Sequence, residues 1–286
     1  MSRRRDKPLL LMSHVSRLLV LALLVAGSLV FLTPFYISVA MSLKSAAELA
    51  QTSVWSWPKS VTLENYREVL ANPNVSFLLF LQNTVVIAGF STLGVVLSSS
   101  MVAYAFARVQ FRGRDRLFIL LLSTMMLPGI VTMIPTYVLY KYLHWVNTFY
   151  PLTVPAFLGG GAFNVFLLRQ FFLSVPVELD EAAKLDGASH WTILTRVIMP
   201  LSGPALATVG VFTFIGSWRD FMGPLIYLND VNKQTLELGL STYASLRAEQ
   251  WHLLMAGSVL VTIPLIIIFL IGQRYFVKGI VMSGMK

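Results

Sequence analysis

The sequence predicts an all-α integral membrane protein with six transmembrane helices, and three observations lead to that fold class. The mean hydropathy is +0.71 over 286 residues, and 56% of the residues are hydrophobic. Only 12% are charged, about half the fraction of soluble domains, so lipid is the expected solvent for much of the surface. The chain also contains six apolar stretches of the roughly 20 residues that cross a bilayer.

The six expected spans follow one another along a single transmembrane domain, residues 1–286. They lie at about 18–41, 77–107, 117–140, 152–172, 204–228 and 253–271. The first follows three arginines and resembles a signal peptide, but its apolar region of about 24 residues exceeds the roughly 7–15 of a signal. We therefore interpret it as a retained span. Pro128 and the glycines at 159–161 are expected to kink or loosen their helices, as either a gate or ordinary bundle packing requires.

Basic residues predict the orientation, because cytoplasmic loops are enriched in Lys and Arg. Fifteen of the 22 basic residues fall on one side of the membrane if the six spans alternate. These are Arg3, Arg4, Arg5, Lys7, Arg17, Arg108, Arg112, Arg114, Arg116, Arg169, Lys184, Arg196, Arg274, Lys278 and Lys286. We therefore expect both termini and the connection 173–203 to be cytoplasmic, in a multi-pass protein.

Composition excludes several function classes. Without cysteine there is no disulfide, thiol nucleophile or cysteine-based metal site, and the four histidines lack metal-ligand spacing. The net charge of +9 lies beside apolar spans and not on a soluble face, so no nucleic-acid partner is expected. No GxxxxGK[ST] loop and no ordered Ser/His/Asp set is present, which predicts that the chain is not an enzyme.

The connection 173–203 is predicted to form two short helices joined at a glycine. Ser174 and Pro176 suit the start of the first helix, whose acidic residues then lie near the positive end of its dipole. Gly187 suits the left-handed position at its end.

The second helix is expected over about 190–198, with Ser189 as its cap and Pro200 as its stop. Neither helix has enough apolar surface to be stable alone. We expect the pair to rest on the membrane helices and on a partner.

At these residues the chain resembles the EAA loop of ABC importer permeases, which has Glu-Ala-Ala, then Gly, then an apolar pair before Pro. The matching positions are Glu181, Ala182, Ala183, Asp186, Gly187, Val197, Met199 and Pro200. Val197 and Met199 replace the Ile and Leu common in the family. Stretches 163–172, 224–228 and 273–279 extend the resemblance over nearly the whole chain, and together they are similar to the carbohydrate-uptake branch, in particular the smaller permease of the maltose-transporter type.

The resemblance implies a set of partners. They are a second, homologous permease, two ATP-binding subunits, an extracytoplasmic solute-binding protein and the lipid of a bacterial or archaeal cytoplasmic membrane. The loop would lie in a cleft of the ATPase, where Ala182 and Ala183 allow close approach and Glu181 meets a basic partner. ATP and Mg²⁺ would be used by the partner ATPase, with no cofactor bound by this chain. The tail with Lys278 and Lys286 would contact the ATPase pair.

Polar residues in the spans are candidates for the translocation path. The candidates are Asn83, Thr84, Ser123, Asn164, Trp218, Arg219 and Asp220. The neutral groups could bind a polyol, or could bond neighbouring helices for about 0.6 kcal/mol each. A charge at the bilayer centre costs about 2.5–3.5 kcal/mol, so Arg219 and Asp220 are expected to face a cavity or to pair with each other or with another helix. Relatives commonly have Asn where Arg219 stands, so ligand preference is expected to differ if it lines the path.

The expected cargo is a sugar, oligosaccharide, glycoside or polyol. The same machinery could carry a glycerophosphodiester or another solute, although few basic residues inside the spans weigh against an anionic one. A stand-alone secondary transporter is the alternative from another class. It would show inverted repeats or charged spans, which the sequence lacks.

Overall fold

A computed structural model describes residues 14–72, 76–246 and 250–283, and those residues form helices without any strand. The predicted all-α fold class is confirmed. The chain divides into two compact units, one of residues 1–68 with 248–259 and one of residues 69–247 with 260–286.

The first unit contains a span and a folded loop. Helix α1 (His14–Ser42) is followed by α2 (Ala46–Gln51) and by the start of α3 (Glu64–Ala71). The loop is organised by Lys44, which is fully buried and donates to Thr52 Oγ1, the Ser53 carbonyl and Ser56 Oγ at 2.8–3.2 Å. An ammonium has three N–H groups, so each of them has an acceptor.

The second unit contains most of the remaining helices. They are α4 (Phe77–Arg108), α5 (Arg114–Ser123), α6 (Gly129–Tyr142), α7 (Tyr150–Thr153), α8 (Ala162–Ser174), α9 (Glu178–Leu185), α10 (His190–Ile193), α11 (Met199–Leu201), α12 (Gly203–Trp218), α13 (Met222–Tyr227) and α14 (Leu236–Leu246). Short 3₁₀ turns cover Thr124–Met126, Val154–Phe157 and Val231–Lys233, and a π-helical turn covers Leu194–Ile198. Helix α15 (Trp251–Ser283) begins in the first unit and continues in the second.

Four helical segments of the described residues are long and apolar enough to cross a membrane, and two bent helix pairs raise the number to six. The four are Ser16–Ser42, Phe77–Arg108, Tyr150–Ser174 and Trp251–Gln273. The segment expected as a span at 117–140 bends by 98° between α5 and α6. The bend falls at Pro128, because proline lacks the N–H of a helical hydrogen bond and forces the preceding Leu127 into an extended conformation.

The segment expected at 204–228 also differs from a continuous helix. Helix α12 ends at Trp218, ten residues before the expected end, and α13 begins at Met222. Before α12, the helical stretch His190–Leu201 meets it at 83°. Pro200 therefore lies inside the second short helix and does not stop it as expected; the chain turns at Ser202 instead.

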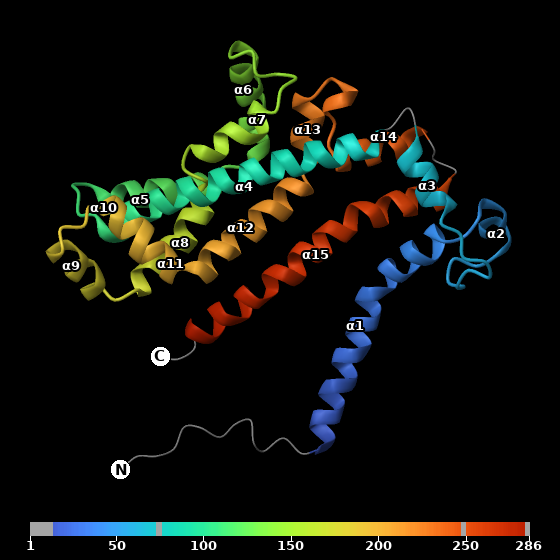
Figure 1. Ribbon diagram of the computed structural model, residues 1–286, viewed down its shortest axis with the longest axis horizontal. Coiled ribbons are helices and arrows are strands. Elements are labelled where there is room, and N and C mark those ends of the chain that lie inside the picture. The colour runs from blue at the N-terminus through green and yellow to red at the C-terminus, as the bar shows by residue number, and fades with distance from the viewer. Residues whose placement is uncertain (1–13, 73–75, 247–249, 284–286) are drawn as a thin grey trace. The chain divides into compact units, whose positions relative to one another are not determined.

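Helix α4 is the central element of the second unit, with α8 and α12 packed along it (Figure 1). The core lies toward the Arg108 end of α4. It consists of buried side chains from α4, α5, α8, α10, the π-helical turn and α12, together with Val175, and includes Ala103, Tyr104, Phe118, Leu168, Phe172, Ile193, Ile198 and Val209. Packing therefore joins α4 directly to the segment that carries the EAA-like residues.

The helix that includes α7 and α8 is interrupted by three consecutive glycines with positive φ. Gly159, Gly160 and Gly161 have φ of 109°, 66° and 83°, which L side chains rarely adopt. A Cβ on Gly160 would lie 2.7 Å from Ser99 Cβ, so α4 also excludes a side chain there. Hydroxyls of α4 satisfy carbonyls of the broken stretch, with Ser91 Oγ donating to Leu152 and Ser98 Oγ to Ala156. The break is thus a packed feature of the bundle.

Candidate coupling segment and translocation path

Helix α9 carries the acidic residues at its beginning, where the helix dipole is positive. The acidic side chains differ in exposure: Asp180 is buried, whereas Glu178 and Glu181 are exposed. Lys184 in the last turn complements the negative end. The expected cap from Ser174 is wrong, because its hydroxyl donates to the Phe171 carbonyl and the residue before α9 is Val177.

The end of α9 is a Schellman motif centred on Gly187, as the glycine predicted. Gly187 has φ 80°, its N–H donates to the Lys184 carbonyl, and the Ala188 N–H donates to the Ala183 carbonyl. No atom lies within 4 Å of a Cβ built on Gly187, so the backbone angle alone requires glycine. This motif fixes the direction in which the chain leaves α9.

The second helix starts with the predicted cap, since Ser189 Oγ accepts from the Thr192 N–H at 3.2 Å. It passes through the π-helical turn and ends at Leu201. π turns are rare and insert an extra residue into the helix. Here the turn contributes Leu194 and Ile198 to the core.

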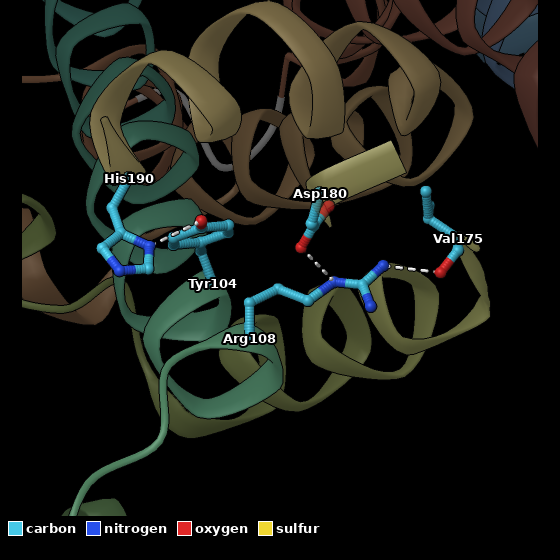
Figure 2. Close-up of polar contacts among 5 residues, drawn as sticks. All are labelled: Tyr104, Arg108, Val175, Asp180 and His190. Carbon is cyan, nitrogen blue, oxygen red and sulfur yellow. Dashed lines mark hydrogen bonds and ion pairs between the residues drawn. The ribbon is translucent and has the colours of Figure 1, made fainter. Parts of the chain in front are cut away.

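Two side chains of α4 attach this segment by polar contacts (Figure 2). Arg108 Nε lies 3.3 Å from Asp180 Oδ2, and Arg108 Nη2 donates to the Val175 carbonyl at 2.5 Å. One turn earlier on α4, the Tyr104 hydroxyl lies 3.1 Å from His190 Nδ1. Arg108 contacts residues before the Glu181–Gly187 stretch, and Tyr104 contacts a residue after it. We call these contacts of Tyr104 and Arg108 the arginine joint.

The surface of the segment facing away from the core is apolar as well as acidic. Leu185 is 89% exposed and Trp191 61% exposed, although neither lies in a candidate straight span. Ala182 is exposed, and Ala183 packs partly against the core. Exposed large apolar side chains beside Glu181 are typical of a protein-binding surface.

The predicted path residues fall in four places in the second unit. Asn83 and Thr84 lie near the Phe77 end of α4, and Asn164 lies just beyond the glycine break, where its amide donates to the Gly160 carbonyl. Ser123 is exposed near the bend that follows α5, and its hydroxyl donates to the Leu120 carbonyl. The described structure does not bring these polar groups together in one cluster.

Trp218, Arg219 and Asp220 lie where α12 ends. Trp218 is buried and its indole donates to the Val261 carbonyl at 3.3 Å. Within the described residues, Arg219 and Asp220 form no ion pair with each other, contrary to one of the expected arrangements. Asp220 Oδ1 instead accepts from the Gly223 N–H at 3.0 Å and caps α13. Arg219 is exposed.

A second attachment to α4 was not predicted from the sequence. Asn83 Nδ2 donates to the carbonyls of Asn232 and Gln234, both at 2.9 Å, and Thr84 Oγ1 accepts from the Leu236 N–H at 2.8 Å. Asn83 and Thr84 are buried. We call these contacts the asparagine joint. The segment they hold, residues 231–238, comprises the 3₁₀ turn Val231–Lys233 and the start of α14.

The segment 231–238 also contains a half-buried carboxyl group. Burial raises the pKa of Glu237, and the field of Arg219 opposes that rise. In the same region Asn147, at a φ of 61°, accepts from the N–H groups of Asn229 and Asp230, and its carbonyl accepts from Lys233 Nζ. A network of main-chain contacts therefore fixes the start of this segment.

The sequence did not predict which residues contact each other in the two joints, although several of these residues were noted. Arg108 was noted only as a basic residue on the expected cytoplasmic side, and Asp180 only as one of the acidic residues at the start of the first predicted short helix. An arginine at the end of an apolar span is the available signal, but it does not identify the acceptor. Lys286, which is predicted to contact the ATPase, lies outside the described residues, as does the side chain of Lys278. Among the described residues, no group of three His, Asp or Glu could hold a metal ion.

The comparison with protein families decides the identity. Residues 99–282 match the family described as binding-protein-dependent transport system inner membrane component. The chain belongs to this family. The permease family predicted from the EAA-like residues is thereby confirmed, and the helices long enough to span are those of a membrane protein.

Relatives of this permease have carbohydrate transporters' names. It is 37% identical over 226 residues to the trehalose/maltose transport system permease protein MalG of Thermococcus litoralis, with 79% of this chain and 81% of the relative covered. It is 34% identical over 229 residues to the arabinooligosaccharides permease AraQ of Halalkalibacterium halodurans, covering 80% and 81%. The maltose/maltodextrin permease MalG of Escherichia coli K12 is 33% identical over 237 residues, with 81% and 80% covered.

A solved structure of similar fold comes from a bacterial ABC transporter involved in the import of the acidic polysaccharide alginate. The TM-score is 0.82 at 26% identity, and the match covers 93% of this permease and 99% of that chain. The agreement covers more of the chain than the family match does. The permease is thus an inner membrane component of a binding-protein-dependent importer.

Proposed function

We propose that this permease imports a carbohydrate, as one of two homologous permeases joined to two ATP-binding subunits, and that residues 173–203 contact the ATPase. The observation that carries the proposal is the construction of α9. Its turn at Gly187 is fixed by a Schellman motif and its inner face is held by Asp180, while Glu181 and Leu185 are exposed. A rigid, exposed surface of this kind suits a partner that moves.

The orientation follows from charge. With the basic residues concentrated on the side of residues 173–203, that segment and both termini are cytoplasmic. ATP hydrolysis and its Mg²⁺ then belong to the partner subunits, and a solute-binding protein delivers cargo from the opposite side. The Lys278–Lys286 tail is on the ATPase side in this arrangement and is proposed to contact it.

Carbohydrate cargo is supported by the relatives, whose names specify maltose, trehalose and arabinooligosaccharides. Of the polar candidates for the path, Asn83 and Thr84 are buried and bonded to the main chain of residues 232–236, whereas, within the described structure, Asn164 and Ser123 bond only carbonyls three or four residues away. We therefore assign the solute path to the region of Asn164, Ser123 and the exposed Arg219, with Asp220 and Trp218 shaping the end of α12.

The test of ATPase contact uses two variants, each with a matched control. Glu181→Lys reverses an exposed charge in the first turn of α9, and Glu64→Lys does the same in the first turn of α3. Gly187→Pro disrupts a left-handed turn, and Gly113→Pro disrupts another with φ 84°. The purified complex in lipid is assayed for retained ATPase subunits and for ATP-driven uptake.

We expect Glu181→Lys and Gly187→Pro each to lower retained ATPase and uptake about tenfold, which corresponds to about 1.4 kcal/mol. The first variant reverses a charge at the proposed interface, and the second distorts the turn that directs the chain away from α9. The two controls should keep both ATPase retention and uptake. Retention of ATPase and uptake in Glu181→Lys and Gly187→Pro would exclude the coupling assignment. Uptake in the absence of ATP would favour a secondary transporter.

Cargo is tested on the solute-binding protein that stimulates ATP hydrolysis by the complex. We expect its melting temperature to rise with oligosaccharides, glycosides or polyols and not with glycerophosphodiesters. The reverse result would assign the alternative cargo.

A further inference from the structure

The arginine joint is buried and charged, which distinguishes it from the other attachments along α4. The side chains of Arg108 and Asp180 are only 8% and 4% exposed. Removing one partner of such a pair leaves the other charge buried without compensation, which is strongly destabilising. Asp180 Oδ1 and Arg108 Nε have no hydrogen-bond partner among the described residues, so the Arg108 guanidinium compensates this carboxylate through charge, as an ion pair at 3.3 Å.

The arginine joint holds residues 173–203, the proposed coupling segment, at two points. Tyr104 and Arg108 are four residues apart and therefore lie on one face of α4. Arg108 reaches Val175 and Asp180 before and within α9, and Tyr104 reaches His190 at the start of α10 (Figure 2). Two attachments on either side of the Gly187 turn prevent the exposed surface from rotating independently of α4.

Helix α4 is suited to carry a displacement over a long distance. It is an unbroken helix of 32 residues without an internal proline, and it is packed against α8 and α12. Thr84 and Arg108 are 24 residues apart, which corresponds to about 36 Å along the axis. Its far end holds residues 231–238 through the asparagine joint.

We propose that Arg108 is a positioning residue of the transport cycle: the arginine joint passes the motion of the coupling segment to α4, and the asparagine joint passes it to residues 231–238. The inference rests on the proposed contact between residues 173–203 and the ATPase. It adds a mechanical connection from that contact to a segment at the opposite end of the longest helix of the second unit.

The experiment measures coupling separately from assembly. The complex of both permeases, ATPase subunits and binding protein is reconstituted in lipid, and solute transported per ATP hydrolysed is determined for Arg108→Gln, Arg108→Lys and Tyr104→Phe. Arg114→Gln is the matched control, because Arg114 pairs with Asp115 at 3.2 Å but that partner is 74% exposed.

We expect Arg108→Gln to retain the ATPase subunits while solute per ATP falls about fivefold, within the range for residues of a coupling network. Arg108→Lys keeps the charge and should recover at least half of the loss. Tyr104→Phe keeps the ring and removes only the hydroxyl, so it should lower the ratio about twofold. Arg114→Gln should match the unaltered complex.

Amide hydrogen exchange of residues 231–238 distinguishes a positioning role from a purely structural one, because a purely structural role would not change the response of these residues to nucleotide. ATP with vanadate should change the protection of these residues in the unaltered complex and should change it less in Tyr104→Phe/Arg108→Lys. An unchanged transport ratio in Tyr104→Phe, or equal nucleotide response of residues 231–238 in that double variant, would overturn the inference even if Arg108→Gln fails to assemble. Failure of the unaltered complex to retain ATPase would instead contradict the proposed function.

Discussion

The two ends of α4 hold their segments by different chemistry. The arginine joint uses a buried ion pair and one tyrosine hydroxyl, whereas the asparagine joint uses an amide and a hydroxyl on main-chain groups. Burying a neutral group that is hydrogen-bonded to the backbone costs little free energy, whereas burying a charge costs much free energy unless its counter-charge is present. The comparison teaches that the end next to the coupling segment is the one where a single substitution is expected to have the larger effect.

The charge at that end has a local reason. Arg108 is the last residue of α4, where a cation interacts favourably with the negative end of the helix dipole. Asp180 lies in the first turn of α9, where an anion is favoured. The ion pair therefore joins the end of one helix to the beginning of another, and both dipoles support it.

Asp180→Asn is expected to have the largest effect of the substitutions that test the difference between the two ends of α4. It leaves Arg108 buried without a counter-charge, so we expect a loss of about 3–5 kcal/mol of stability. The measurement is the apparent melting temperature of the purified complex. The double variant Asp180→Asn/Arg108→Gln should lose less than the sum of the single variants, and simple additivity would contradict a direct pair.

Asn83→Ala breaks the neutral end. It removes two hydrogen bonds to carbonyls and leaves their oxygens buried, which should lower stability by about 1–2 kcal/mol. Residues 231–238 should also exchange amide hydrogens faster. Asn164→Ala, which removes one local bond to Gly160, is the control that leaves this exchange unchanged. A loss equal to that of Asp180→Asn would remove the proposed difference between the ends.

Tyr104→Phe sharpens the comparison within the arginine joint. The hydroxyl makes one hydrogen bond to His190 while the ring stays in the core, so the expected loss is about 0.5–1.5 kcal/mol. Thermal unfolding of the variant measures it. A loss as large as that of Asp180→Asn would show that the tyrosine, and not the ion pair, dominates this end.

Glu237→Gln gives the smallest expected effect, beside the asparagine joint. Burial raises the pKa of Glu237, so folding favours the protonated carboxyl group. The resulting stabilisation is fully present below the ordinary pKa of 4.5 and is lost as pH rises through the folded-state pKa. The uncharged variant should therefore melt about 1–2 °C higher at pH 8 and equally at pH 4. A difference at pH 4 alone would contradict this sign.

The features that the sequence predicted are those with local causes. Gly187 and Ser189 end and start helices by their own backbone and side-chain preferences, and the structure places both as expected. Pro128 was expected to disturb its span, but the 98° bend depends on how the halves pack and was not predictable. Arg108 and Asp180 are 72 residues apart in the chain, so only the folded bundle shows that they meet.

The two bent helix pairs have a consequence for biogenesis. A segment that turns by 98° or 83° cannot present one straight apolar rod of about 20 residues to the insertion machinery, unlike α1 or α4. Backbone groups freed at a bend in lipid need partners from neighbouring helices. We therefore expect residues 114–142 and 204–218 to enter the bilayer late, against helices that are already there.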